Sequence, residues 1–360
     1  MINKDILVIY PETKTTQVAL YKGTSLLFLK NIKHDVEKLK SLKDEGMEAR
    51  MKYRTEAILK ELTENDTDFG EIEIIVGRGG LLKPLNAGVY EVNEKMVNDL
   101  KVGLEGVHHT NLGGMIAYEV AKQIKAKPIL TDPVSVDEMD DIAKVSGHPL
   151  FERKSIFHAL NQKYFAKRYA KANHKKYEEV NLIVATIGMG GISVAAHRKG
   201  RVVDVNNAFD GEGAFSIKRT GSLPLGDVVR LCFSGEYSEK DVMEMITQKG
   251  GYFAYLGTAN INQINAMIEG GDEKAIFISD ACAYQVSKEI AAMSAVLKQK
   301  VDAIILTGNI FHSDRFLSKI QKRLGGIANF TLYPSINDVE ALAANGFLVL
   351  KGELEVQEYE

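Results

Sequence analysis

The sequence has little of three features that mark whole classes of protein. Its 360 residues include only two cysteines, Cys232 and Cys282, which are too few for a disulfide framework. Both cysteines lie in apolar runs, so we expect them to be small core residues. No apolar run is long enough to cross a bilayer, and the first residues carry no long apolar stretch, so no membrane association is expected. The default expectation is a reducing, cytoplasmic location.

An excess of charge of one sign is also lacking. Lys and Arg number 45 and Asp and Glu number 48, which gives a formal net charge of -3. So small an imbalance provides no long-range field for nucleic acid or acidic membranes, and neither is expected as a partner. His108 and His109 have no Cys or acidic cluster around them at ligand spacing, so the sequence predicts no zinc site.

The P-loop pattern and the dinucleotide fingerprint are both absent, but three glycine turns are present. Two of them directly follow buried strands. Glycine lets backbone N–H groups approach a phosphate, so together the turns favour a nucleotide site. The residues that we assign to nucleotide binding are Gly190, Gly191, Asp210, Gly211, Gly213, Gly308 and Asn309.

The length favours two domains, because 360 residues exceed one comfortable core. Both halves open with the same order of strand, turn, strand, turn, strand. The predicted strands are Ile6–Tyr10, Gln17–Tyr21 and Leu26–Ile32, then Val180–Ala185, Ile192–Ala196 and Arg201–Val205. We interpret this order as a duplicated α/β unit. The alternative is that such hairpins occur in any α/β protein.

Three charged residues in predicted turns are candidates for the chemistry of a site. Arg78 and Arg219 lie in glycine-containing turns, where each would form either a surface salt bridge or a planar contact with phosphate or carboxylate. Asp132 follows a predicted strand and precedes Pro133. It is either an ordinary turn residue or a carboxylate for a metal-linked phosphoryl transfer.

Seven segments of the sequence resemble segments of the butyrate kinases. They are Val76–Pro84, His108–Gly113, Asp132–Met139, Glu152–Lys163, Asp204–Gly213, Leu231–Gly235 and Lys300–Gly308. The resemblance runs from about Ile6 to Leu350. It implies an α/β fold of duplicated actin-like (ribonuclease H-like) domains with a cleft between them. The expected domains are residues 1–155 with 340–360, and residues 156–339.

The resemblance also implies a reaction and a set of site residues. Butyrate kinases transfer a phosphoryl group between ATP, with Mg²⁺, and a short-chain carboxylic acid, and they assemble as homodimers or larger oligomers. By position, Arg78 and Arg219 resemble the two phosphate-clamping arginines, and Asp132 resembles the catalytic carboxylate, which we also expect at the metal. Gly308 resembles part of the adenosine-side turn. Asp338 is what remains of an acidic cluster at the metal.

Other positions depart from the family pattern. Where the family has Asn-Pro-Gly-Ser-Thr-Ser-Thr-Lys, this chain has Tyr10-Pro-Glu12-Thr13-Lys14-Thr-Thr-Gln17. Tyr10 replaces a polar residue, Glu12 adds a negative charge, and Gln17 removes a positive charge that Lys14 restores in part.

Two further family residues are missing. A family histidine falls on Thr186 or Ile187, depending on where the gap is placed, and Asn309 replaces a glycine. Two hypotheses follow. The chain is a carboxylate kinase of the butyrate kinase type, whose phosphate loop is impaired. Alternatively, it keeps the fold without turnover and binds or modulates a partner.

Overall fold

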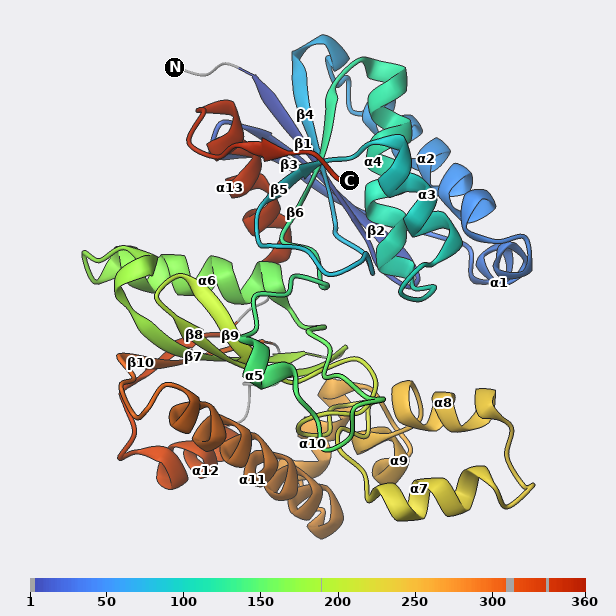
Figure 1. Ribbon diagram of the computed structural model, residues 1–360. Coiled ribbons are helices and arrows are strands. Elements are labelled where there is room, and N and C mark those ends of the chain that lie inside the picture. Colours follow the sequence, from blue (N-terminus) through green and yellow to red (C-terminus); the bar gives the residue numbers. More distant parts are fainter. Residues whose placement is uncertain (1–3, 189, 309–313, 335–336) are drawn as a thin grey trace. The chain divides into compact units, whose positions relative to one another are not determined.

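The computed structural model describes residues 4–188, 190–308, 314–334 and 337–360 (Figure 1). The chain forms two compact units. The first comprises Met1–Val136 and Asn337–Glu360, and the second comprises Asp137–Ile336. The sequence predicts a first boundary near residue 155 instead. In the structure, residues 137–155 are tied to the second unit by hydrogen bonds from Asp140 to Val203 and from Arg153 to Val205.

A seven-stranded mixed sheet forms the centre of the first unit, with strand order β12-β5-β6-β4-β1-β2-β3. The strands are β1 (Asp5–Pro11), β2 (Thr15–Lys22), β3 (Ser25–Lys33), β4 (Ile72–Gly77), β5 (Val89–Glu91), β6 (Lys127–Thr131) and β12 (Val356–Gln357). The helices are α1 (Val36–Asp44), α2 (Met47–Glu64), α3 (Glu94–Val102), α4 (Leu112–Ile124) and α13 (Asp338–Leu350), with short 3-10 turns at Phe69–Glu71 and His109–Asn111.

Strand β1 is buried along all seven of its residues, because helices cover both faces of the sheet at its centre. Helices α4 and α13 both pack against β1, β4 and β6 (Figure 1). Successive strand residues point to opposite faces, so Leu7 and Ile9 join the core beneath α2 and α4. Ile6 lies on the α13 side, where a Cβ on Gly346 would come within 3.0 Å of it.

A five-stranded sheet forms the centre of the second unit, with strand order β11-β10-β7-β8-β9. The strands are β7 (Asn181–Gly188), β8 (Gly191–Arg198), β9 (Arg201–Val205), β10 (Ala303–Gly308) and β11 (Phe330–Tyr333). The helices are α5 (Asp141–Lys144), α6 (Ala159–Ala172), α7 (Leu225–Cys232), α8 (Glu239–Thr247), α9 (Gly251–Leu256), α10 (Ile261–Glu269), α11 (Glu273–Val296) and α12 (Asp314–Leu324), with a 3-10 turn at Tyr177–Glu179.

The two sheets repeat one topology. In each, three antiparallel strands in chain order (β1-β2-β3 and β7-β8-β9) are extended on the other side of the first strand by parallel strands (β4 and β6, or β10 and β11). The duplicated α/β unit expected from the sequence is therefore present.

One local expectation was wrong. Cys282 is buried, but Cys232 is exposed at the end of α7, because no residue of that helix is buried. The charged segment 35–62 forms two helices, α1 and α2, which Gly46 separates with a φ of 90°. No helix in the described part of the chain is long and apolar enough to span a membrane.

Candidate active site

The predicted site residues of the first unit gather at one edge of its sheet. Strands β1, β4 and β6 are parallel neighbours, so their carboxyl ends meet at the same edge. Glu12 comes directly after β1, Arg78 after β4 and Asp132 after β6. In α/β sheets this is the edge at which ligands bind. The topology thus brings together residues that are far apart in the sequence.

Tyr10, near the end of β1, contacts two of the other predicted site residues. Its hydroxyl donates a hydrogen bond of 2.6 Å to Asp338 Oδ2, and the guanidinium carbon of Arg78 lies 4.2 Å from the centre of its ring. The Tyr10 side chain is only 8% exposed. Burial raises the pKa of its hydroxyl well above the ordinary value, and the nearby Arg78 opposes that rise. Tyr10 is therefore a protonated donor to Asp338.

The turn between β1 and β2 is tied down by a residue that the sequence analysis did not identify. Arg54 of α2 is completely buried, and it donates hydrogen bonds to the backbone oxygens of Glu12 (2.9 Å), Thr13 (3.0 Å) and Thr15 (2.7 Å). Burial lowers its pKa to about 10. A helical pattern alone gives no signal that one charged residue on α2 points inward.

The altered residues of this turn have different surroundings. Glu12 is half-buried and accepts a 2.5 Å hydrogen bond from Thr15 Oγ1. Thr13 and Lys14 are exposed, and Gln17 pairs with Tyr10 across the hairpin. The carboxylate of Glu12 is thus engaged within the turn itself.

Asp132 has an unusual backbone conformation. Its φ is 39°, although it is not glycine, and it is buried. Its carboxylate accepts a hydrogen bond of 2.9 Å from the N–H of Gly88, and its own N–H donates to the Gly88 carbonyl at 3.0 Å. Non-glycine residues in this region are strained and concentrate at functional sites, where the surrounding structure holds them in place.

Glycines bring the Arg78 turn close to its neighbours. A Cβ on Gly77 would lie 2.5 Å from the Gly113 carbonyl oxygen, and one on Gly80 would lie 2.6 Å from the Cα of Asn111. The 3-10 turn that contains His109 therefore packs directly on this turn. The ring of His109 lies 4.0 Å from that of His108. Burial, with the charges of His108 and Arg78, lowers the pKa of His109 far below its ordinary value, so its ring is neutral.

In the second unit, the side chains of Thr186 and Ile187 point to opposite faces of β7. Ile187 points into the apolar core beneath α11, whereas Thr186 points to the opposite face of β7, on the α6 side. Thr186 donates a hydrogen bond of 3.1 Å to Asn161 Oδ1, and no hydrogen-bond partner of the buried Asn161 Nδ2 lies in the described part of the chain. Of the two residues on which the family histidine falls by sequence, Thr186 is thus the one with polar surroundings.

A different histidine lies near Thr186, on the same side of the sheet. His158, at the start of α6, lies with its Nδ1 2.8 Å from Ser193 Oγ, and Ser193 pairs directly with Thr186 across the sheet. His158 lies in the family-like segment Glu152–Lys163, and the sequence predicts no role for it. Its place in that segment was the only available signal.

Arg219 and the predicted glycine turns lie in the second unit. Arg219 is buried, donates to the Phe209 carbonyl, and places its guanidinium carbon 4.6 Å from the Phe209 ring centre. Burial lowers its pKa to about 10, while Asp210 acts in the opposite direction. Asp210 itself accepts a 2.7 Å hydrogen bond from Asn207.

The glycines have positive φ where the sequence analysis expected close approach. Gly191, Gly211, Gly213 and Gly308 have φ values of 136°, 139°, 77° and 121°. A Cβ on Gly308 would lie 2.0 Å from the Ile187 oxygen, so only glycine is accommodated there. Gly190 is exposed and Asn309 lies outside the described residues.

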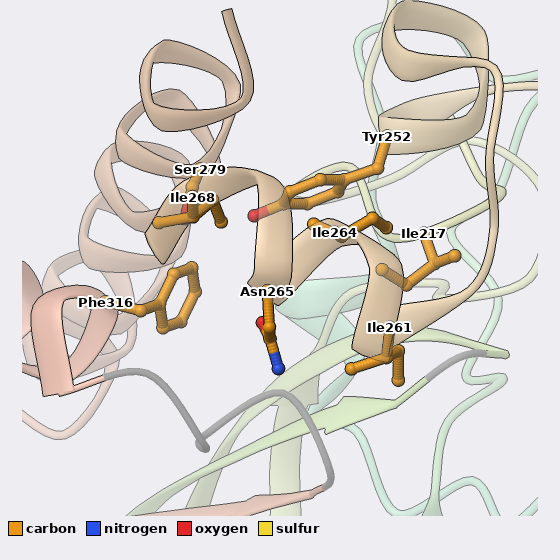
Figure 2. Close-up of a pocket in the computed structure, with 8 residues that line it drawn as sticks. All are labelled: Ile217, Tyr252, Ile261, Ile264, Asn265, Ile268, Ser279 and Phe316. Carbon is orange, nitrogen blue, oxygen red and sulfur yellow. The ribbon is translucent and has the colours of Figure 1, made fainter. Parts of the chain in front are cut away.

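A cavity of about 20 Å³ lies in the second unit between α9, α10, α11 and α12 (Figure 2). It is lined mostly by apolar side chains, including Ile264 and Phe316, with the amide of Asn265 and the hydroxyls of Tyr252 and Ser279. Its volume accommodates about one water molecule and is too small for a nucleotide base. Within the described residues, no group of three or more His, Cys, Asp or Glu side chains is placed to hold a metal.

Comparison with known proteins places this geometry in a class. The fold is similar to that of a Porphyromonas gingivalis acetate kinase, with a TM-score of 0.79 over 97% of this chain and 100% of the other at 15% identity. A propionate kinase from Francisella tularensis gives a TM-score of 0.76 over 95% and 98% at 16% identity. The fold is thus an α/β fold with two mixed sheets, of the acetate kinase type, as the sequence predicted.

Sequence comparison is more specific. Residues 147–325 match the model of the acetokinase family. Butyrate kinase 2 of Clostridium acetobutylicum is 46% identical over 98% of this chain and 99% of its own. A probable butyrate kinase of Listeria monocytogenes is 42% identical over 99% of each. The chain therefore belongs to the acetokinase family and, within it, to the butyrate kinases. The family identified from the sequence is confirmed.

Proposed function

We propose that this chain transfers a phosphoryl group between ATP and a short-chain carboxylic acid, such as butyrate or a branched-chain acid. One observation carries the proposal. Arg78 and the strained Asp132 directly follow β4 and β6, two neighbouring parallel strands whose carboxyl ends lie at the same edge of the sheet. Phosphoryl transfer needs positive charge and a carboxylate, and these two side chains supply one of each. This chemistry is that of the butyrate kinases to which the chain belongs. An ATP-dependent reaction also favours the expected cytoplasmic location.

Catalysis in this proposal comes from positioning and charge. Arg78 contacts an oxygen of the phosphoryl group or of the acid, and Asp132 orients the attacking carboxylate or holds the metal. His109, neutral and next to the Arg78 turn, and His158 are candidates for further hydrogen bonds to oxygen. Assignment of Arg219 to the same phosphoryl group, and of the glycine turns to the nucleotide, stays a prediction from the resemblance.

The residues present are compatible with Mg²⁺. Asp132 and Asp338 supply carboxylate oxygens, the ligands that Mg²⁺ prefers, and Mg²⁺ usually takes its remaining ligands from water and phosphate. Two protein carboxylates are therefore sufficient. When bound, the ion would offset negative charge on the phosphates.

The decisive experiment is a coupled ADP-release assay over acids from acetate to branched valerates, together with calorimetry of ATP binding in the presence of magnesium. Turnover with a four- or five-carbon acid is expected. The second candidate function, an inactive protein that binds or modulates a partner, is favoured by one observation. The Tyr10 ring covers one face of Arg78, where the family has a smaller polar residue. ATP binding without turnover of any acid would support that candidate, and absence of ATP binding would exclude the kinase.

The proposal extends to a homodimer formed through α7. Leu225, Val229 and Phe233 lie four residues apart on one face of this helix and are 79%, 55% and 87% exposed. The ion pair of Asp227 and Arg230 lies on the opposite side of the helix, so the exposed face is apolar and suits pairing with the same face of a second copy about a two-fold axis. Sedimentation velocity should show a dimer that Val229→Asp converts to a monomer. A wild-type monomer would contradict this.

A further inference from the structure

We propose that Tyr10 is a positioning residue that fixes both Arg78 and Asp338, and that its ring and its hydroxyl do so separately. The inference rests on the proposed function and reverses the expectation drawn from the sequence. By sequence, the replacement of a polar residue by Tyr10 is one of the changes that impair the phosphate loop. The contacts indicate instead that the tyrosine holds the two charged groups on either side of it.

The hydroxyl acts on Asp338. Its 2.6 Å hydrogen bond links the end of β1 to the first turn of α13, which is 328 residues away in the sequence. Carboxylates that bind metals are themselves commonly held by an outer hydrogen bond, and losing that bond weakens the metal site. Tyr10 supplies such a bond to Asp338. The Tyr10 side chain is buried, so this bond is shielded from solvent.

The ring acts on Arg78. The guanidinium lies over the ring face at 4.2 Å, and Nη1 donates to the Pro11 carbonyl oxygen at 3.2 Å. In the described part of the chain, no acidic side chain forms an ion pair with Arg78. The bond to the Pro11 carbonyl is the only hydrogen bond of its side chain there. A guanidinium has five N–H donors, so several remain for the oxygens of a ligand. Stacking on one face leaves the edge of the guanidinium, with those donors, available.

The two contributions can be separated by substitution. Tyr10→Phe keeps the ring under Arg78 and removes the bond to Asp338. The Mg²⁺ concentration for half-maximal rate should rise about tenfold, in the range seen when an outer-shell partner of a metal ligand is removed. The KM for the acid should stay within about twofold. Calorimetry of Mg²⁺ binding in the presence of ADP should show the same loss without turnover.

Tyr10→Leu removes both contributions. The Mg²⁺ effect should be as in Tyr10→Phe, and in addition the KM for the acid and the calorimetric Kd for inorganic phosphate should rise about tenfold, because Arg78 loses its stacking partner. Tyr21→Leu is a matched control, since Tyr21 is also 8% exposed and lies on the neighbouring strand β2. It should lower the unfolding temperature without changing phosphate affinity.

The outcomes distinguish this inference from the proposed function. If wild type binds phosphate but turns over no acid, while Tyr10→Leu loses affinity and Tyr10→Phe keeps it, Tyr10 positions Arg78 and the kinase proposal fails alone. If Tyr10→Leu binds phosphate as well as or better than wild type, or if neither binds, the positioning role is overturned. Equal effects of Tyr10→Phe and Tyr10→Leu on every readout would also contradict it, because the ring would then contribute nothing.

Discussion

At the scale of single residues, the remaining N–H donors of Arg78 give the sharpest prediction. Arg78→Ala should lower kcat/KM for the acid by about 100-fold or more, since it removes charge-assisted hydrogen bonds to a desolvated anion. Stability should fall by only about 1 kcal/mol, the size of the lost contact with the Tyr10 ring.

Arg78→Lys is the matched control. It keeps the charge without the planar group, so its activity should lie between those of wild type and Arg78→Ala. Steady-state kinetics and urea unfolding measure both quantities. Full activity in Arg78→Ala would remove this residue from the site.

The position of the absent histidine gives a second residue-scale prediction. Thr186→His should raise activity about tenfold, because the new ring would lie where the family has a histidine, next to Asn161. The Nδ2 atom of Asn161 has no hydrogen-bond partner among the described residues. Overpacking should cost roughly 1–3 kcal/mol of stability. Ile187→His is the control, because its side chain enters the apolar core. It should cost more stability and bring no gain. If only Ile187→His raised activity, the family histidine would correspond to Ile187 and not to Thr186.

At the scale of elements, the hairpin turn between β1 and β2 depends on helix α2. Arg54→Met should destabilise the protein by about 3 kcal/mol or more, since three backbone carbonyl oxygens of the turn lose their donor in a buried place. Activity should fall as well, because the turn would no longer be fixed. Urea unfolding and kinetics check both effects.

Arg50→Met is the comparison variant on the same helix. Arg50 is half-buried, and its one side-chain hydrogen bond in the described part is to the Met47 sulfur. Its loss should cost less than about 1 kcal/mol. If Arg54→Met proves equally mild, the turn is held by the sheet alone.

Strands and helices with a regular pattern of apolar residues were predictable from the sequence. Contacts between residues of different elements were not. The six strands of the two opening hairpins were identified because β-rich apolar runs alternate with polar turns. Arg78 and Asp132 were identified because charged residues follow buried strands. The inward direction of Arg54, the bond from Tyr10 to Asp338 and the outward face of Cys232 depend on which elements become neighbours. The local sequence pattern does not specify which elements pack together.

At the scale of the whole molecule, buried neutral histidines make stability depend on pH. Burial lowers the pKa of His34 from 6.5 to about 4. Between those values the unfolded chain binds a proton that the folded chain does not, so stability is full above about pH 6.5 and falls as the pH drops toward 4. His34 alone accounts for about 3 kcal/mol at most.

This dependence can be measured by urea unfolding at pH 7 and pH 5. His34→Asn should reduce the difference between the two values, whereas His174→Asn, at an exposed position, should leave it unchanged. An unaltered difference in His34→Asn would assign the effect to other groups.

The division of the chain also sets an order of events during synthesis. Domains commonly fold in the order in which they leave the ribosome. Here the first unit needs α13, whose Gly346 fits against Ile6 and Val76, and β12, which pairs with β5. Both lie within the last 24 residues, Asn337–Glu360. A chain that ends at residue 336 therefore contains the whole second unit, whereas its first unit lacks α13 on one face of β1. Such a truncated chain, released from the ribosome, should resist protease in the second unit and be cut in the first.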